Sequence, residues 1–169
     1  MNWKPFTIAG LAAALAFQFS GDARAQSSTM ADTLVVVDAW APATLDTATE
    51  GYAYFTLRNT GDRLVRLIEV RAKVADLIAL GETTLESDGD VHHSAVYSVV
   101  VPPHGAVALS PDGNLVLLRD LTKPLKEGMT FDLRLTLYDG SLVSMTVPVV
   151  AADAMGPETA NLQPTEDPR

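Results

Sequence analysis

The sequence predicts an all-β fold, an antiparallel Greek-key-type β-sandwich or barrel. Short runs of β-branched, aliphatic and aromatic residues are separated by clusters of Gly, Pro, Asn and Asp, which is typical of this class. In residues 130–138 apolar and polar side chains alternate as in a half-buried strand, the apolar ones being Phe131, Leu133, Leu135 and Leu137. Asp139-Gly140 follows, and this pair is a strong signal for a tight hairpin into residues 141–150.

The same pattern predicts nine strands in order. They span residues 33–40, 51–58, 63–71, 74–82, 91–101, 106–110, 115–118, 130–138 and 141–150. Residues 75–79 also fit a helical turn, which leaves the fourth run ambiguous. In the second run only one alternating pair can face the core, and we expect Ala53 and Phe55 to do so instead of the tyrosines beside them.

Length and composition exclude several classes of protein. A chain of 169 residues, 47% hydrophobic, predicts one folded domain. The net charge of -9, without any run of Lys or Arg, argues against nucleic acid or anionic lipid as the main partner. The absence of cysteine excludes a disulfide framework, a thiolate metal site and a cysteine nucleophile. No apolar run reaches the ~18 residues of a membrane-spanning helix.

The first 25 residues follow the pattern of a secretory signal peptide. Lys4 supplies a positive charge, residues 6–19 form an apolar stretch, and Ala23 and Ala25 occupy the two positions that signal peptidase reads. We therefore expect export, with the periplasm as destination. The expected organisation is a signal peptide at 1–25, a flexible segment at 26–32, a β-sandwich domain at 33–150 and a disordered, proline-rich acidic tail at 151–169.

Candidate chemistry is confined to the histidines. The sequence has no nucleophile elbow, phosphate loop or dinucleotide fingerprint, so we expect no enzymatic activity. His92 and His93 are adjacent in an expected strand, where their side chains point to opposite faces. One of the two imidazoles belongs to a metal site, or the pair is a polar strand end; both interpretations stay open. His104 lies in a Pro-Pro-His-Gly turn and is expected to be solvated.

The order of several short motifs resembles the periplasmic copper chaperones of the PCu(A)C type, which are small cupredoxin-like sandwiches. The matching segments are Asp38-Ala-Trp-Ala-Pro42, Gly51-Tyr-Ala-Tyr-Phe-Thr-Leu-Arg-Asn-Thr-Gly61, Leu80-Gly-Glu82 and Pro124-Leu-Lys-Glu-Gly128. Together with the turns between them they extend over roughly residues 34–150. The resemblance implies the cupredoxin-like fold and a role in carrying Cu(I).

Members of that family hold Cu(I) with the pattern His, ten residues, Met, twenty-one residues, His-x-Met. In this chain the pattern falls on Gly81, His92, Asn114 and Val116 without insertion or deletion. Gly81 and Val116 carry no donor atom, and the amide oxygen of Asn114 is a hard ligand that suits Cu(I) poorly. His92 is the one good ligand that remains, and His93 joins it only if the strand bulges.

Two functions follow as alternatives. The first is delivery of Cu(I) to respiratory oxidase assembly, with a copper-site subunit of the oxidase as partner and His92 and His93 as candidate ligands. The second is a metal-free binding module that kept the sandwich and engages another envelope protein. In either case the equal spacing predicts that the four family positions still converge in space.

The signal-peptide assignment gives a direct prediction. Processing after Ala25 should leave a mature protein that begins at Gln26, because small residues stand at both recognition positions. Intact-mass measurement on the exported protein tests it, and any other N-terminus contradicts the assigned cleavage site.

Overall fold

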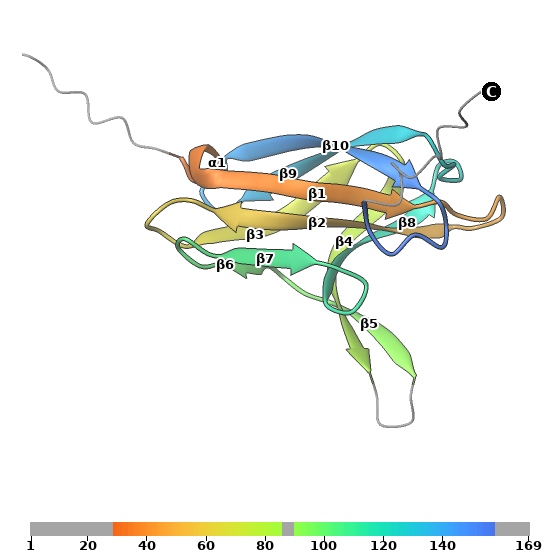
Figure 1. Ribbon diagram of the computed structural model, residues 1–169, viewed down its shortest axis with the longest axis horizontal. Helices are drawn as coiled ribbons and strands as arrows, with labels where there is room; N and C mark the ends of the chain where they lie inside the picture. Colours follow the sequence, from red (N-terminus) through yellow and green to blue (C-terminus); the bar gives the residue numbers. More distant parts are fainter. Residues whose placement is uncertain (1–28, 86–89, 158–169) are drawn as a thin grey trace, which may run out of the picture.

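The computed structural model describes residues 29–85 and 90–157, and these form one ten-stranded sheet with a single short helix. The helix is α1 (Met30–Thr33), and the strands are β1 (Leu34–Pro42), β2 (Glu50–Asn59), β3 (Val65–Ala72), β4 (Ala75–Leu85), β5 (Val91–Ala95), β6 (Val99–Val101), β7 (Ala106–Leu109), β8 (Asn114–Leu121), β9 (Thr130–Leu137) and β10 (Leu142–Val150). The all-β prediction is therefore confirmed (Figure 1).

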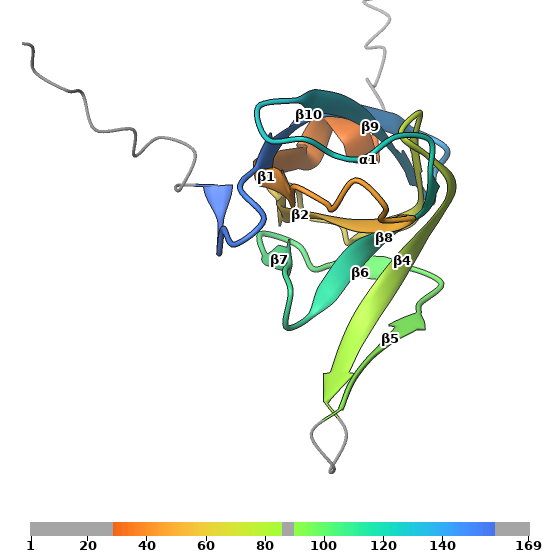
Figure 2. The same ribbon diagram turned by 90° about the vertical axis from the view of Figure 1, so that its right-hand side faces the viewer.

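The strand order across the sheet is β5-β4-β8-β7-β2-β1-β10-β9-β3-β6. Most neighbours are antiparallel, and two short pairings, β1 with β10 and β7 with β8, are parallel. The sheet curls so that β9 and β10 lie on one side of the core and β2 and β8 on the other (Figure 2). The β4–β5 hairpin points away from both.

The segment 91–101, expected as one strand, forms two strands at opposite ends of the sheet. β5 pairs with β4, whereas β6 pairs with β3. The reason lies in burial: Val99 and Val101 fill the core, while every residue of β5 except His93 is exposed. One straight strand cannot pair with β4 at one end of the sheet and with β3 at the other.

The main core lies between the two sides of the curled sheet. Leu133, Leu135 and Leu137 of β9 are fully buried in it, as their alternation predicts. Ala53 and Phe55 of β2 also point into this core, so the expected inward pair is confirmed. Asp139-Gly140 makes the predicted hairpin between β9 and β10, with Gly140 at a φ of 82°.

A second apolar cluster covers the opposite face of β2 and β8. Its buried members are Trp40, Tyr54, Leu115, Leu117 and Val150, with Tyr52, Ala79 and Ala154 packed against them. Tyr54 is thus buried as well, on the other face from Ala53 and Phe55. The chain after β10 contributes to this cover through Ala154, within the region expected to be a flexible tail.

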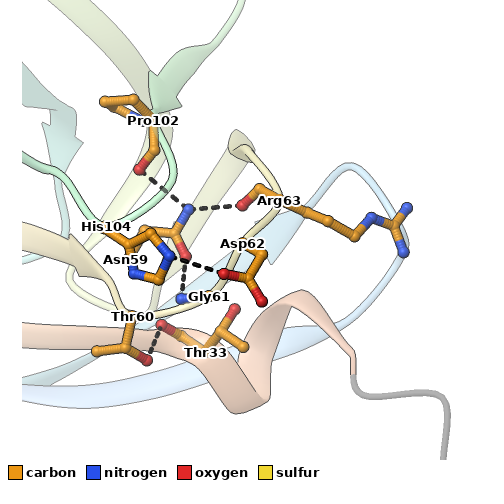
Figure 3. A network of polar contacts seen from close by, with 8 residues as sticks. All are labelled: Thr33, Asn59, Thr60, Gly61, Asp62, Arg63, Pro102 and His104. Carbon is orange, nitrogen blue, oxygen red and sulfur yellow. Dashed lines mark hydrogen bonds and ion pairs between the residues drawn. The ribbon is translucent and has the colours of Figure 1, made fainter.

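Asn59, at the end of β2, is the only buried polar residue in the described part of the chain. Its side-chain amide donates to three main-chain carbonyls, those of Arg63 at 2.7 Å, Pro102 at 3.1 Å and Val101 at 3.3 Å. Its side-chain oxygen accepts the Gly61 N–H at 3.0 Å (Figure 3). One side chain therefore joins the β2–β3 turn to the β6–β7 turn.

Exposed contacts extend this network toward the N-terminus. His104 has a φ of 52° and its Nε2 lies 2.8 Å from Asp62 Oδ1, with both side chains largely in solvent (Figure 3). The Thr60 hydroxyl donates to the Thr33 carbonyl at 3.0 Å. The Met30 N–H donates to Asp139 at 2.8 Å, which ties α1 to the β9–β10 hairpin. The signal segment 1–25 and the end of the tail, 158–169, lie outside the described residues.

Asn59→Ala should lower the free energy of unfolding by about 1–3 kcal/mol, because it removes the donor for buried carbonyls and strands the Gly61 N–H. Urea denaturation measures this loss. Asp62→Ala is the matched control, since it removes only an exposed contact of the same network and should change stability by less than about 1 kcal/mol. Equal losses in the two variants would contradict the role assigned to Asn59.

Candidate functional site

The family ligand positions lie on three adjacent strands, β5, β4 and β8. Gly81 of β4 is opposite Leu115 of β8, so it lies between the pairs that contain Asn114 and Val116. Paired residues share a face of the sheet and successive residues alternate. Gly81 therefore faces the second cluster with Leu115, whereas Asn114 and Val116 face the other way. Val116 is fully buried in the main core. Three of the expected positions are neighbours along the backbone, but their side-chain directions do not converge.

The space beside Gly81 is already filled. A Cβ atom at this position would lie 2.8 Å from Leu117 Cδ1, 3.3 Å from Leu117 Cγ and 3.4 Å from Leu115 Cδ1. Both leucines are buried. Gly81 does not have a left-handed backbone conformation. Among the described glycines, Gly128 and Gly140 have a positive φ. The obstacle to a side chain at position 81 is thus packing, and not the φ angle.

The two adjacent histidines face opposite sides of the β4–β5 hairpin. His92 is opposite Thr84 and His93 is opposite Thr83, in a ladder without a bulge. They therefore cannot share one metal ion. His92 is exposed and lies three residue pairs from Gly81 along the ladder, a distance of about 10 Å.

His93 is held on the face of the second cluster. Its Nδ1 is 3.2 Å from the hydroxyl oxygen of Thr83, and that hydroxyl donates to the Pro111 carbonyl at 2.8 Å. Since the Thr83 proton is committed to Pro111, His93 Nδ1–H is the donor to Thr83. The imidazole ring also lies 5.3 Å from the Tyr52 ring, centroid to centroid. Thr83 and Tyr52 fix His93 as part of an aromatic surface.

The residues present do not fit a Cu(I) cargo. In the described part of the chain no three His, Cys, Asp or Glu side chains come together as metal ligands. Of the described methionines, Met30, Met129 and Met145 pack against the main core and Met155 is exposed. The family pattern of spacing is kept, but three of its four positions lack a suitable donor, and Leu117 occupies the space beside Gly81.

An aromatic row runs across this face, and the sequence did not indicate it. The ring centroids of Trp40 and Tyr54 are 4.7 Å apart, and those of Tyr54 and Tyr52 are 6.4 Å apart. The row continues from Tyr52 to His93. Burial, followed by the charges of Tyr52 and Asp112, raises the pKa of Tyr54 to about 12. Tyr54 is therefore a neutral packing residue at physiological pH. The alternation of Tyr52 and Tyr54 with Ala53 and Phe55 was the one available signal that β2 is covered on both faces.

Comparison with known families decides the identity of this sandwich. The LpqE-like family, whose description names a lipoprotein, matches residues 34–149, which is the whole sheet except its last residue. The chain belongs to the LpqE-like family. A search of curated proteins finds no match.

This LpqE-like chain is similar to solved structures of PCuAC domains and of DR1885. The Cu(I) form of DR1885 from Deinococcus radiodurans is 26% identical with a TM-score of 0.58, over 79% of this chain and 87% of that one. The apo PCuAC domain of PmoF1 has 22% identity and a TM-score of 0.60, over 70% and 94% of the two chains. The copper-bound PCuAC domain of PmoF2 has 22% identity and a TM-score of 0.59, over 70% and 93%.

These similarities confirm the resemblance to the PCu(A)C type and its cupredoxin-like fold. The PmoF domains, at 22% identity, support the fold alone, and the family match adds the LpqE-like assignment. Within the described residues, no helix is long and apolar enough to cross a membrane.

Gly81→His should lower the free energy of unfolding by about 1–3 kcal/mol, because the new side chain must displace the buried Leu117. Adding Leu117→Ala should make the double variant more stable than the sum of the two single losses predicts, since the smaller residue frees the space. Thermal or urea unfolding of all three variants measures this coupling.

Gly113→His serves as the control, because a Cβ there meets only Ser110 Oγ, at an ordinary 3.4 Å. If Gly81→His is no more harmful than Gly113→His, Leu117 does not block the family position.

Proposed function

We propose that this LpqE-like protein is an exported, metal-free member of the copper-chaperone fold, and that it acts as a non-enzymatic binding module for a protein of the cell envelope. The observation that carries the proposal is the occupation of the first ligand position: Leu117 fills the room beside Gly81. A site that had merely lost a ligand would be open. Here the second apolar cluster has grown into it.

The other ligand positions support the same conclusion. Val116 is a fully buried core residue, and Asn114 faces the same side as Val116, away from Gly81. Tight binding of Cu(I) takes two or more soft or imidazole donors at one point. With His92 and His93 on opposite faces of the hairpin, the chain offers one imidazole on each face.

Delivery of Cu(I) to a respiratory oxidase subunit is the alternative that the family resemblance suggests. It is favoured by the similarity to DR1885, which has been solved with Cu(I) bound. For this chain it would require ligands outside the family pattern, with His92 or His93 among them. The expected periplasmic location suits either function, because both need an exported protein.

Copper retention tests the proposal. The exported protein, loaded with Cu(I) under reducing conditions and then dialysed against a competing chelator, should retain far less than one copper per chain. DR1885, treated in parallel, is the positive control and should keep its copper.

One equivalent of retained copper would overturn the metal-free assignment. The same measurement on His92→Ala and His93→Ala, made separately, would then identify which imidazole holds the ion. Because the two side chains lie on opposite faces, only one of these variants should lose copper.

A further inference from the structure

The β4–β5 hairpin extends past the rest of the sheet. β4 pairs with β8 only as far as Glu82, opposite Asn114. Beyond that pair the hairpin continues to Leu85, opposite Val91, as a two-stranded ribbon. Both views show it projecting from the sandwich (Figures 1 and 2). β5 is the last strand of the sheet, and no described strand pairs with its outer edge.

The two faces of this hairpin differ in chemistry. Counting along the ladder from Gly81, one face carries His93 and then the pair Leu85 and Val91. Leu85 is 73% exposed and Val91 57%, so this apolar pair lies in solvent. The other face carries Glu82 and Thr84 with their partners and is polar. The hairpin is amphipathic, although neither face is covered at its tip.

The apolar face of the tip continues the aromatic row of the sandwich. Tyr52 lies beside His93, and His93 is two residues from Val91 on the same face of β5. The row therefore runs from the buried Trp40 and Tyr54, through the half-buried Tyr52 and His93, to the exposed pair at the tip. A row that begins in a packed cluster gives the tip a rigid base, which lowers the entropic cost of binding.

Charge is distributed unevenly around this hairpin. Residues 74–118 contain no Lys or Arg, and they contain six acidic residues, Asp76, Glu82, Glu86, Asp88, Asp90 and Asp112. Basic residues gather elsewhere, for example Arg71 opposite Arg134 where β3 meets β9. A second copy of the chain would bring like charges together at the hairpin. A cationic partner would instead meet complementary charge.

We propose that the β4–β5 hairpin is a docking surface for an extended, cationic segment of a partner protein. The segment adds as a strand to the free edge of β5, its apolar side chains pack on Leu85 and Val91, and its Lys or Arg side chains face Glu82 and Asp90, the exposed acidic residues of the described part of the hairpin. This inference rests on the proposed role as a binding module, and it names the surface and the chemistry of the partner.

A peptide of alternating Lys and Val, seven residues long and blocked at both ends, is the probe. It is titrated into the ¹⁵N-labelled protein, and the amide shifts of the protein are followed by NMR. We expect the shifts to concentrate on residues 82–85 and 90–95. A matched peptide with Glu in place of Lys should bind about tenfold more weakly or not at all.

The double variant Leu85→Thr/Val91→Thr should also bind the cationic peptide about tenfold more weakly, because it removes the apolar contact. Threonine keeps the β-branched shape that suits a strand, and unchanged amide signals in the sandwich show that the variant is folded. Val35→Thr/Leu142→Thr is the matched control, since it removes two exposed apolar side chains from β1 and β10 and should leave binding unchanged.

Three results would overturn the inference: no shifts in residues 82–85 and 90–95 at millimolar peptide, shifts centred on the other sheet edge at β6, or equal binding of the Lys and Glu peptides. Dimerisation of the protein alone through the hairpin, seen by analytical ultracentrifugation and lost in Leu85→Thr/Val91→Thr, would replace the cationic partner with a second copy. None of these results depends on copper retention, so failure of the docking surface and failure of the metal-free assignment are distinguishable.

Discussion

Strand β8 has to fill space on both faces of the sheet at once, and the rest of the structure depends on that requirement. Val116 and Leu118 belong to the main core. Leu115 and Leu117 alternate with them along the strand and belong to the second cluster. The four residues are almost completely buried, which explains the continuous apolar run in the sequence. A strand packed on both faces leaves no room for polar ligands. The second cluster and the absence of a side chain at position 81 therefore go together.

Much of the fold could be predicted from the sequence because its signals are local. The alternation in β9 and the Asp-Gly turn after it require only neighbouring residues to be compared. The division between β5 and β6 could not be predicted in this way, because no Gly or Pro stands between Ala95 and Val99 and the break is imposed by distant partners, β4 and β3. The turns around Asn59 were indicated by composition, but the bonds that join them link segments more than 40 residues apart.

The candidate site was predictable only in part, for the same reason. Spacing along the chain located the family positions and showed that three of them lack suitable ligands. It could not show which way they face, since the direction of Gly81 relative to Asn114 and Val116 is set by the pairing of β4 with β8. The charge around the hairpin, in contrast, can be seen in the sequence, because residues 74–118 lack Lys and Arg. Only the structure shows that this stretch includes a free sheet edge.

The leucine beside Gly81 also constrains how the domain can change over evolutionary time. A mutation that places a ligand at position 81 meets the buried Leu117. The order of steps then matters: position 117 has to shrink first, and that step brings no copper and loses packing. Selection acting on one substitution at a time therefore meets a loss of packing at the first step toward a ligand at position 81. The glycine thus couples any gain of a ligand at position 81 to a second change at position 117.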